Sequence, residues 1–598
     1  MTNNKNQFYE KRAEQFHLAF KKAGKALNLY AFLRLLCFVV FGTGLYFSLK
    51  TNAYVITGIS AAFVVIFLIL LKLYTKTQKN KEYCHLLEKI NRDELKSLQH
   101  EFTQFENGAE YIDKNHQNTY DLDIFGEGSV FQFINRTVTI AGKQLLAGWL
   151  QRPFTEKKEI TDRQNAVREL ADCPEWRHHF MALGLQHKES AAEKTSLLEW
   201  INEPVKTANS LFFKTILIAV PAVTFAVLIL AVLQVIPGVF AGLAVVLQLF
   251  IVGNYLRLIN RIHAKVTDKV NMLRKYARLI NEIESRQFAS GKLNEMLQCL
   301  KQDNIPAGKR IRNLEKILKA FDNRLNLLAG FILNSLLLWD LQCWYRIEKW
   351  KNRNKQAMPV WFDVIAGFDA FTSLANYHFN HPDFVFPEIT DQIPLLETKS
   401  TGHPLIPREK RVCNDFSLTD FGQFTIITGA NMAGKSTFLR TTGVNLLLAM
   451  TGAPVCAKQW RFFPVHVYTS MRTSDSLHEN ESYFYAELKR LKILIQRLEK
   501  GEKLFIILDE ILKGTNSTDK QQGSLIALEK LAYLNGAGII ATHDLSLGKL
   551  EEKLPRNIRN MSFEVEIEGD KIHFDYILRR GITRKMNAEL LMKQMGII

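Results

Sequence analysis

The sequence has few cysteines and no arrangement of them that would hold a metal ion. Its seven cysteines are scattered over 598 residues, without a Cys-x-x-Cys pair or a cluster of histidine and cysteine. This pattern argues against structural zinc and for a reducing compartment. Acidic residues are also in deficit, with 60 Asp and Glu against 77 Lys and Arg. The basic balance fits an anionic partner, either a nucleic acid or the cytoplasmic face of a membrane, and does not choose between them.

A signal peptide is also missing, because residues 1–30 are polar and basic without a short apolar core or a cleavage site. Two apolar stretches follow at 31–49 and 54–71, and each is near the ~20 residues needed to cross a bilayer. They predict a transmembrane hairpin over 31–72, in which Arg34 must snorkel or pair. Lysines flank the hairpin on both sides and its turn has few, so the positive-inside rule places the rest of the chain in the cytoplasm.

A second pair of apolar stretches predicts another hairpin of the same orientation over 211–256. No Asp, Glu, Lys or Arg occurs from Thr215 to Leu256, and Arg257 follows directly. A buried pair of core helices is the alternative, but roughly forty residues without a charge exceed what such helices usually show. We therefore expect four membrane-spanning helices and a multi-pass protein of the inner, or cytoplasmic, membrane.

The remaining chain before residue 390 carries helical periodicity. Residues 82–112 are amphipathic, and 257–300 read as a long charged helix with Leu and Ile at helical spacing. A third apolar segment, 327–342, is interrupted by Asn334, Asp340 and Gln342. For this segment we expect a long buried cytoplasmic helix rather than another membrane span.

A glycine-rich loop at 429–437 follows an apolar, β-branched run that begins at Phe424. The Gly-x-x-x-x-Gly-Lys-Ser pattern between a strand and a helix predicts a phosphate-binding P-loop rather than a chance glycine turn. Lys435 is expected to reach the β- and γ-phosphates of ATP, and Ser436 to help bind Mg²⁺. The predicted nucleotide-binding residues are Gly429, Ala430, Asn431, Met432, Ala433, Gly434, Lys435, Ser436 and Thr437.

An acidic pair, Asp509 and Glu510, ends a second apolar run that begins at Lys503. After a P-loop, a strand followed by an acidic pair predicts a Walker B arrangement, although a solvated pair at a strand end is common in isolation. Asp509 is expected to hold Mg²⁺, and Glu510 to orient or deprotonate the attacking water. A third predicted strand, 538–541, leads to His543.

The stretch Thr428-Gly-Ala-Asn-Met-Ala-Gly-Lys-Ser-Thr437 resembles the P-loop of the MutS family, including its Asn-Met pair. Residues 135–167 and 361–376 are similar to the start and the closing helix of that family's helical core. The resemblance implies an α/β P-loop (ABC-type) ATPase domain preceded by an all-α MutS-like core, here with two transmembrane helical hairpins. The expected parts are a basic N-terminal segment (1–30), hairpin 1 (31–72), helical core (82–210), hairpin 2 (211–256), lever and core (257–390), ATPase domain (391–570) and dimerisation element (571–598).

The resemblance also implies a homodimer with nucleotide sites shared between subunits. His543 takes the position of a switch histidine near the γ-phosphate, and Ser482 that of a serine that reaches the partner's γ-phosphate. The loop 511–516 corresponds to one that crosses the dimer interface. Some residues differ from the usual family pattern, namely Ala430, Ala433, Glu481, Leu512, Lys513 and Asn516. No adenine-stacking aromatic is evident before the P-loop, where Arg411 or Val412 would cover the base.

Membership of this family implies DNA as a ligand, plausibly a branched or mismatch-repair-like structure. The first 110 residues have no room for a mismatch-reading wedge domain, and no large clamp insertion is evident. The alternative is an ATP-driven membrane switch that acts on a protein or lipid without DNA. A transporter is less favoured, because the four apolar stretches contain almost no charge that would mark a substrate path.

Overall fold

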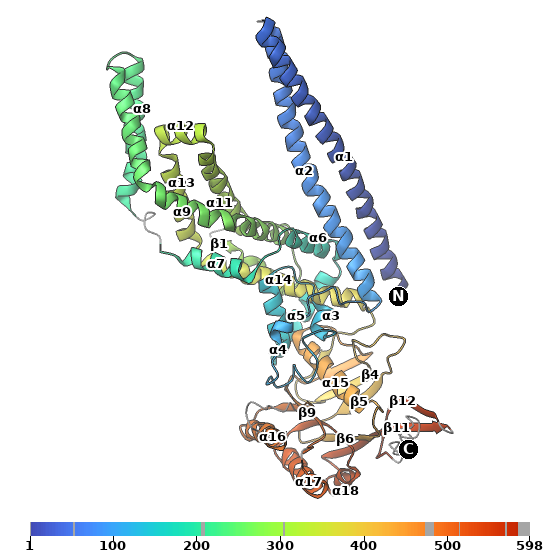
Figure 1. Cartoon of the computed structure of the whole chain (residues 1–598). Helices are drawn as coiled ribbons and strands as arrows, with labels where there is room; N and C mark the ends of the chain where they lie inside the picture. Colours follow the sequence, from blue (N-terminus) through green and yellow to red (C-terminus); the bar gives the residue numbers. More distant parts are fainter. Residues whose placement is uncertain are drawn as a thin grey trace.

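The structure is a computed structural model that describes residues 2–51, 54–204, 210–302, 305–472, 483–513, 515–568 and 571–583. Two long helical arms diverge from a helical middle, and the β-sheets lie at the opposite end of the molecule (Figure 1). The described part of the chain is therefore mostly helical with two larger mixed sheets and one very short one.

The first arm is an antiparallel pair of long helices, α1 (Thr2–Thr51) and α2 (Tyr54–Leu98). The basic N-terminal segment and the first apolar stretch are one continuous helix, so no boundary separates them in space. The guanidinium of Arg34 lies over the rings of Phe67 and Tyr74, 5.3 and 5.1 Å from their centroids. These cation–π contacts supply the partner that the sequence required for a charge in an apolar stretch.

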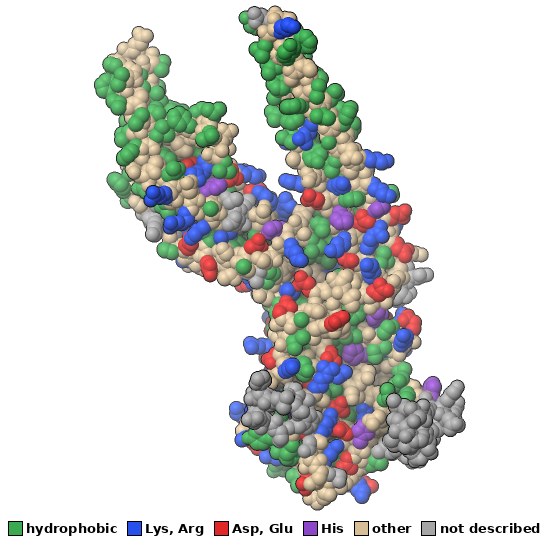
Figure 2. Space-filling view, in the orientation of Figure 1, with side chains coloured by type: hydrophobic (Ala, Val, Ile, Leu, Met, Phe, Trp, Pro, Cys, Tyr) green, Lys and Arg blue, Asp and Glu red, His purple; other side chains and the backbone are tan. Residues whose placement is uncertain are grey.

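The second arm contains α8 (Leu211–Val232) and α9 (Gly238–Glu284), which pack against each other. Together the two arms supply four helices that are long and apolar enough to cross a membrane, and their apolar stretches are largely exposed. Figure 2 shows this apolar surface concentrated at the free ends of both arms, with charged side chains nearer the sheets. This distribution is typical of helices whose surroundings are apolar rather than aqueous.

Three expectations for the helical middle were wrong. The segment 327–342 is not one long buried helix: α12 (Leu327–Leu337) and α13 (Trp339–Asn354) meet at an angle of 79°, and half of the apolar side chains of α12 are exposed. Within residues 82–112, α2 ends at Leu98, and only the short helix η1 (Ala109–Tyr111) follows. The long helix expected over 257–300 ends at Glu284, and a short loop separates it from the next helix.

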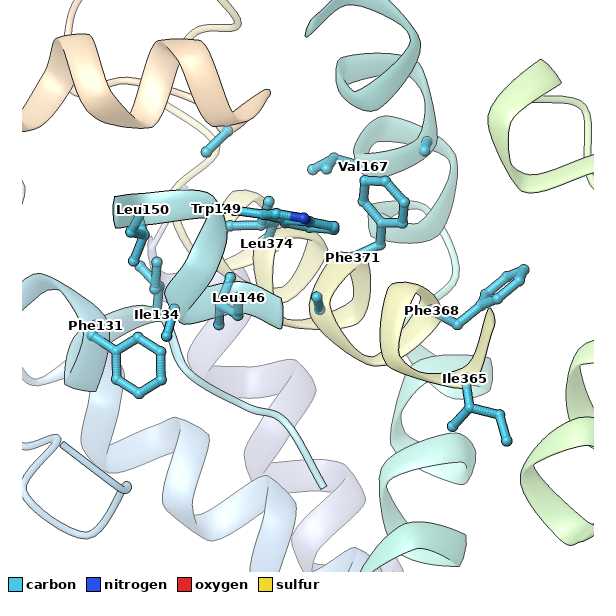
Figure 3. Packing of buried hydrophobic residues seen from close by; sticks show 14 of the residues in the cluster. Phe131, Ile134, Leu146, Trp149, Leu150, Val167, Ile365, Phe368, Phe371 and Leu374 are labelled. Carbon is cyan, nitrogen blue, oxygen red and sulfur yellow. The ribbon is translucent and has the colours of Figure 1, made fainter. Parts of the chain in front are cut away.

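The helical core surrounds α14 (Ala357–Asn380), which is buried along most of its length. Its apolar residues pack against α4 and α5, as Figure 3 shows for Trp149, Phe371 and Leu374. The other helices of this middle region are η1 (Ala109–Tyr111), α3 (Val130–Ile134), α4 (Ile140–Gln151), α5 (Lys157–Ala171), α6 (Pro174–Leu185), α7 (Ala191–Asn202), α10 (Gly291–Cys299), α11 (Ala307–Asp322) and η2 (Asn323–Leu325). A short hairpin, β1 (Lys301–Gln302) and β2 (Ile305–Pro306), precedes α11.

The larger sheet has the strand order β12-β11-β6-β10-β9-β8. All its strands are parallel to their neighbours except the edge strand β12. Its strands are β6 (Phe424–Gly429), β8 (His466–Ser470), β9 (Leu504–Asp509), β10 (Ala537–Thr542), β11 (Ile558–Glu568) and β12 (Lys571–Arg580). The smaller sheet, in the order β3-β7-β4-β5, comprises β3 (Glu388–Ile389), β4 (Leu396–Thr401), β5 (Asn414–Leu418) and β7 (Gln459–Phe462).

Both faces of the larger sheet are covered, because successive side chains of each strand point to opposite faces. Ile427 and Ile507 pack on the face shared with the helical core and α15 (Lys435–Thr451). Ile426 and Ile506 pack on the other face, against α16 (Tyr483–Glu499) and α17 (Ser517–Tyr533). Two short helices, η3 (Leu545–Lys549) and α18 (Leu550–Lys553), complete the second face.

Candidate functional site

The predicted site residues follow three neighbouring strands of the larger sheet. β10 lies between β6 and β9 and is parallel to both, with Thr542 opposite Thr428 and Ala541 opposite Asp509. The carboxyl ends of β6, β9 and β10 therefore meet at one edge of the sheet. Ligands of open α/β sheets bind at this edge, where loops leave the strands.

The glycine-rich loop connects β6 to α15. At two of its positions a residue larger than glycine would not fit. A Cβ on Gly429 would lie 2.8 Å from the carbonyl oxygen of Phe563, which is shorter than any real contact. Gly434 has a φ of 104°, and a Cβ there would lie 3.0 Å from the ring of Tyr576. The loop thus follows a path that only glycine allows at these two positions.

Lys435 is buried, and its amine donates hydrogen bonds of 2.8 Å to the carbonyl oxygens of Gly429 and Ala430. Burial lowers the pKa of this amine below its ordinary value, while the nearby charges of Asp509 and Glu510 oppose that effect. The loop therefore folds around its own lysine, and the two carbonyl groups hold the amine near the N-terminus of α15.

Ser436 and Asp509 lie in contact across the site, because the Ser436 hydroxyl donates a 2.7 Å hydrogen bond to Oδ2 of Asp509. One oxygen comes from the first turn of α15 and the other from the end of β9. Hydroxyl and carboxylate oxygens are the ligands that Mg²⁺ prefers, usually together with waters and phosphate oxygens. The donor set therefore fits Mg²⁺.

Glu510 follows Asp509 with a φ of 58°, and its amide donates a 2.9 Å hydrogen bond to the carbonyl oxygen of Ala541. This bond to the neighbouring strand fixes the backbone that carries the carboxylate. The Glu510 carboxylate lies 3.7 Å from the amine of Lys520 on α17, and both side chains are partly exposed. A left-handed conformation in a residue other than glycine is unusual and is often found at functional sites.

His543 follows β10 and lines the same space as the preceding residues. Burial lowers the pKa of its imidazole below the ordinary value of 6.5, and the charge of Lys435 lowers it further. The ring is therefore neutral at pH 7, and it can donate or accept one hydrogen bond at each nitrogen according to its tautomer.

The structure brings most of the predicted residues around one cavity of about 610 Å³. Those that line it are Asn431, Met432, Gly434, Lys435, Ser436, Thr437, Asp509, Glu510 and His543. Gly429, Ala430 and Ala433 do not line the cavity; Ala430 and Ala433 are buried beneath it. Ser482 and the preceding segment from residue 473 lie outside the described residues, as do Gly514 and residues 584–598. Lys513, which departs from the family pattern, lines the cavity.

Several lining residues were missed by the sequence analysis, Tyr576 above all. Its ring lies against the glycine-rich loop, and Asn414 holds its backbone through a 2.9 Å hydrogen bond to the Tyr576 carbonyl oxygen. Of the two candidates for covering a base, Val412 lines the cavity and Arg411 does not. Arg411 instead donates to the carbonyl oxygen of Ile406 and contacts Cys456. The only signal for Tyr576 was an aromatic residue in the last strand, which by itself indicates packing.

Comparison with known families supports this reading of the motifs. Residues 425–590 match the model of MutS domain V, and residues 112–187 match that of MutS domain III. The cavity residues from Asn431 to Tyr576 lie within the first match. Hairpin 2 lies between the two matched regions, and hairpin 1 precedes both.

Individual proteins resemble the chain over a similar part. MutS protein homolog 4 of Mus musculus is 31% identical over 238 residues, which cover 38% of this chain and 24% of that protein. The DNA mismatch repair protein MutS of Thermotoga sp. (strain RQ2) is 29% identical over 253 residues, or 41% of this chain and 30% of that protein. The Fusobacterium nucleatum protein of the same description is 34% identical over 240 residues, with 38% and 25% covered. The chain thus spans less than a third of the length of these relatives.

Proposed function

Because the chain belongs to the MutS family, we propose that it is a membrane-anchored ATPase that binds and hydrolyses ATP as a homodimer and binds DNA. The observation that carries the proposal is the convergence of Lys435, Ser436, Asp509, Glu510 and His543 on one cavity. A volume of about 610 Å³ is in the range of small-molecule sites.

Each of these side chains has a chemical role in phosphoryl transfer. Lys435 would exchange its two carbonyl partners for phosphate oxygens, and Ser436 and Asp509 would hold Mg²⁺. When bound, the metal ion neutralises charge on the phosphates. Glu510 would accept the proton of the attacking water, and His543 would hydrogen-bond that water or the γ-phosphate.

The cavity also offers surfaces that suit a nucleoside. Val412, Ile406 and the exposed ring of Tyr576 line it, together with the polar side chains of Lys410 and Asn414. Aromatic and aliphatic side chains give a planar base surfaces on which to stack. We assign base binding to Tyr576 and Val412.

The dimer is proposed from family membership and from the resemblance of Ser482 and the loop 511–516 to residues that reach the partner subunit in that family. Lys513 of that loop lines the cavity, and its ammonium group would face a phosphate of the same or the neighbouring subunit. Ser482 keeps its proposed role toward the partner's γ-phosphate. A composite site of this kind would make hydrolysis depend on both subunits.

We place the four apolar helices in the inner membrane and the sheets in the cytoplasm. The support is that these helices are largely exposed and apolar, and that Lys and Arg flank both hairpins on the side of the sheets. Hairpin 1 and hairpin 2 would both cross the bilayer, leaving only their turns outside.

A basic cavity between α11 and α13 favours DNA binding over the alternative function, a membrane switch that acts without DNA. A cavity of about 510 Å³ lies between α11 and α13 and is lined by Lys309, Arg310, Arg312, Lys316 and Arg353, with no acidic residue. Within the described part of the chain, the four exposed cations among them form no ion pair. Such a basic, concave surface is the electrostatic footprint expected for phosphate contacts.

The test is the ATPase rate of the protein in lipid nanodiscs, with duplex, mismatched or four-way-junction DNA, over a range of salt concentrations. DNA is expected to stimulate hydrolysis, and the effect should weaken steeply with salt. Lys316→Glu should reduce the slope of log affinity against log salt by about one or more. Lys500→Glu, an exposed charge reversal on the sheet end, is the matched control and should leave stimulation unchanged. Intact basal hydrolysis without DNA binding or stimulation would instead favour the membrane switch.

A further inference from the structure

One apolar helix, α12, lies beside hairpin 2 and is only partly packed against the rest of the protein. α11 runs along α9, η2 ends it, and α12 then turns before α13 returns toward the core (Figure 1). The turn between α12 and α13 is at Leu338, which has a φ of 50°. A bend of 79° between the two helices excludes a single straight span.

Hydrogen bonds place α12 beside the apolar part of hairpin 2. Gln248 of α9 accepts a 2.7 Å hydrogen bond from Thr224 of α8 and donates one of 3.2 Å to the backbone oxygen of Asn334. Farther along α9, beyond Arg257, Asn260 accepts a hydrogen bond from the side chain of Arg324. At about 1.5 Å per residue, Gln248 lies roughly 14 Å along α9 beyond Arg257, the first charge after the apolar stretch. That distance is about half the hydrocarbon thickness of a bilayer.

The outward side of α12 is apolar and exposed. Leu327 and Leu328 are 89% and 78% exposed, and Phe331 and Ile332 are 58% and 52% exposed. No charged residue occurs from 325 to 339. Figure 2 shows the apolar surface of α8 continuing onto this corner of the arm, above charged side chains.

The polar residues of this segment form hydrogen bonds and an ion pair around the turn between α12 and α13. Asn334 accepts a 3.0 Å hydrogen bond from the amide of Asp340 and donates one of 3.0 Å to the carbonyl oxygen of Gly330. Asp340 is buried and forms an ion pair with Arg324, and Trp339 donates to the carbonyl oxygen of Ala320. Irregular backbone is tolerated at membrane depth only where the protein itself satisfies it in this way.

We propose that α12 is a re-entrant helix whose exposed face contacts acyl chains in the half of the bilayer nearer the ATPase domain. This inference rests on the proposed membrane anchoring through hairpin 2. Lipid is the occupant because the exposed face continues the apolar surface of α8 at the same depth. Cations follow immediately below it on α9 and α11, at Arg257, Arg261 and Lys319, where they would meet the headgroups.

The experiment measures where a fluorescent label on α12 resides in the full-length protein in lipid nanodiscs. The parent variant carries Cys173→Ser, Cys299→Ser and Cys413→Ser, which removes the three cysteines that are not buried. An environment-sensitive NBD label is placed at Leu328→Cys. Matched labels at Val246→Cys on α9 and Lys349→Cys on α13 report the expected lipid and water positions. The parent variant, treated with the same NBD reagent, checks that the buried cysteines do not react.

The label at residue 328 is expected to behave like that at residue 246. Quenchers on the lipid acyl chains should remove most of the fluorescence at both positions, and aqueous iodide should quench only at residue 349. Iodide quenching at 328 with lipid quenching at 246 would overturn the inference and leave membrane anchoring intact. Protection of 328 from both quenchers would show protein contact, such as a second copy, and would also overturn it. Iodide quenching at both 246 and 328 would reject the anchoring itself.

Discussion

At the scale of single residues, Lys435 and Glu510 have separable roles. Lys435 is held by the carbonyl groups of its own loop, which phosphate oxygens can replace. The Glu510 backbone is held by a hydrogen bond to Ala541, which involves no residue of the glycine-rich loop. The lysine is therefore expected to govern binding, and the glutamate the chemical step.

Glu510→Gln is expected to bind MgATP as the unaltered protein does and to lower kcat by about 100-fold or more, because an amide cannot accept the proton of the attacking water. Binding is measured with a fluorescent ATP analogue and turnover by phosphate release. Lys435→Ala is the contrasting variant and should lose binding. An undiminished kcat for Glu510→Gln would remove this residue from the role of general base.

His543 should couple nucleotide binding to proton uptake. Burial and Lys435 lower the pKa of the imidazole in the folded protein, so protonation favours the unfolded chain as the pH falls through 6.5. The negative charge of a bound γ-phosphate raises that pKa again. ATP binding near pH 6 is thus expected to take up a fraction of a proton, seen by calorimetry as a dependence of the heat on buffer ionisation enthalpy. His543→Gln should abolish this dependence, and its persistence in that variant would assign the proton to another group.

The candidate nucleotide residues could be predicted from the sequence because each lies at a strand end or in the short loop and first helical turn that follow it, so each motif is local. The strand ends meet because parallel strands align their carboxyl ends. Tyr576 could not be predicted in this way. It reaches the loop from β12, through an antiparallel pairing with β11 that is fixed only by tertiary contacts. Arg411 and Val412 are neighbours whose side chains separate in the fold, which the sequence alone does not distinguish.

At the scale of elements, a buried polar junction attaches the first arm to the core. Glu94 on α2 accepts hydrogen bonds from Arg136 and from Asn380 at the end of α14. Asn380 also accepts a 2.6 Å hydrogen bond from Tyr9 on α1. The network joins both helices of the arm to the helix that leads toward the smaller sheet, so these elements are coupled by direct contacts.

Glu94→Gln should weaken this junction severely, because the side chains of Glu94 and Arg136 are 1% and 3% exposed. Removing one partner of a buried ion pair leaves an unpaired charge and typically costs about 3 to 5 kcal/mol. The midpoint of thermal unfolding in detergent micelles is expected to fall clearly. Asp391→Asn, which breaks the exposed ion pair with Lys157, is the control and should cost under ~1 kcal/mol. Equal midpoints for the two variants would show that the junction does not stabilise the fold.

The helices and strands that could be predicted are those with sustained periodicity, such as α8, α9 and the strands of the larger sheet. The break at Leu338 was missed because three polar residues in an apolar run are compatible with either of two structures. They can form the polar contacts of a straight, buried helix, or they can accompany a turn between two helices. In the structure Asn334 and Gln342 instead hydrogen-bond to the backbone of a sharp turn, and Asp340 forms an ion pair with Arg324. This choice depends on Gln248 and Arg324, which are distant in sequence from the turn.

At the scale of the whole molecule, the free ends of the two pairs of arm helices lie at the same end and the sheets at the other (Figure 1). The sequence predicted the orientation of each hairpin separately from flanking charge. It could not predict that the arms diverge, because their directions depend on contacts such as those of Tyr9 and Asn380. In the structure both arms leave one core toward the same side, as the common orientation predicted for the two hairpins requires.

This arrangement predicts which positions face the outside of the cell. Single cysteines at Lys50 and Val235, in or beside the two turns, are expected to react with an impermeant maleimide added to intact cells. Lys76→Cys, on the cytoplasmic side of hairpin 1, should react only after permeabilisation. Reaction at 76 with protection at 50 and 235 would invert the topology. Reaction at only one of the two turns would mean that the hairpins do not cross the same bilayer in the same sense.

The two arms diverge from the helical core, so with both free ends held in one bilayer, the arms and the membrane would form a closed frame, and the ATPase domain would lie on the far side of the core from the membrane. Extracting a hairpin would expose its apolar surface to water at about 25 cal/mol per Å². Any change in the angle between the arms would therefore move the hairpins sideways through the lipid rather than out of it. Resistance to that movement would act as a mechanical load on the proposed nucleotide cycle, and the lateral pressure of the bilayer would set how far the frame opens.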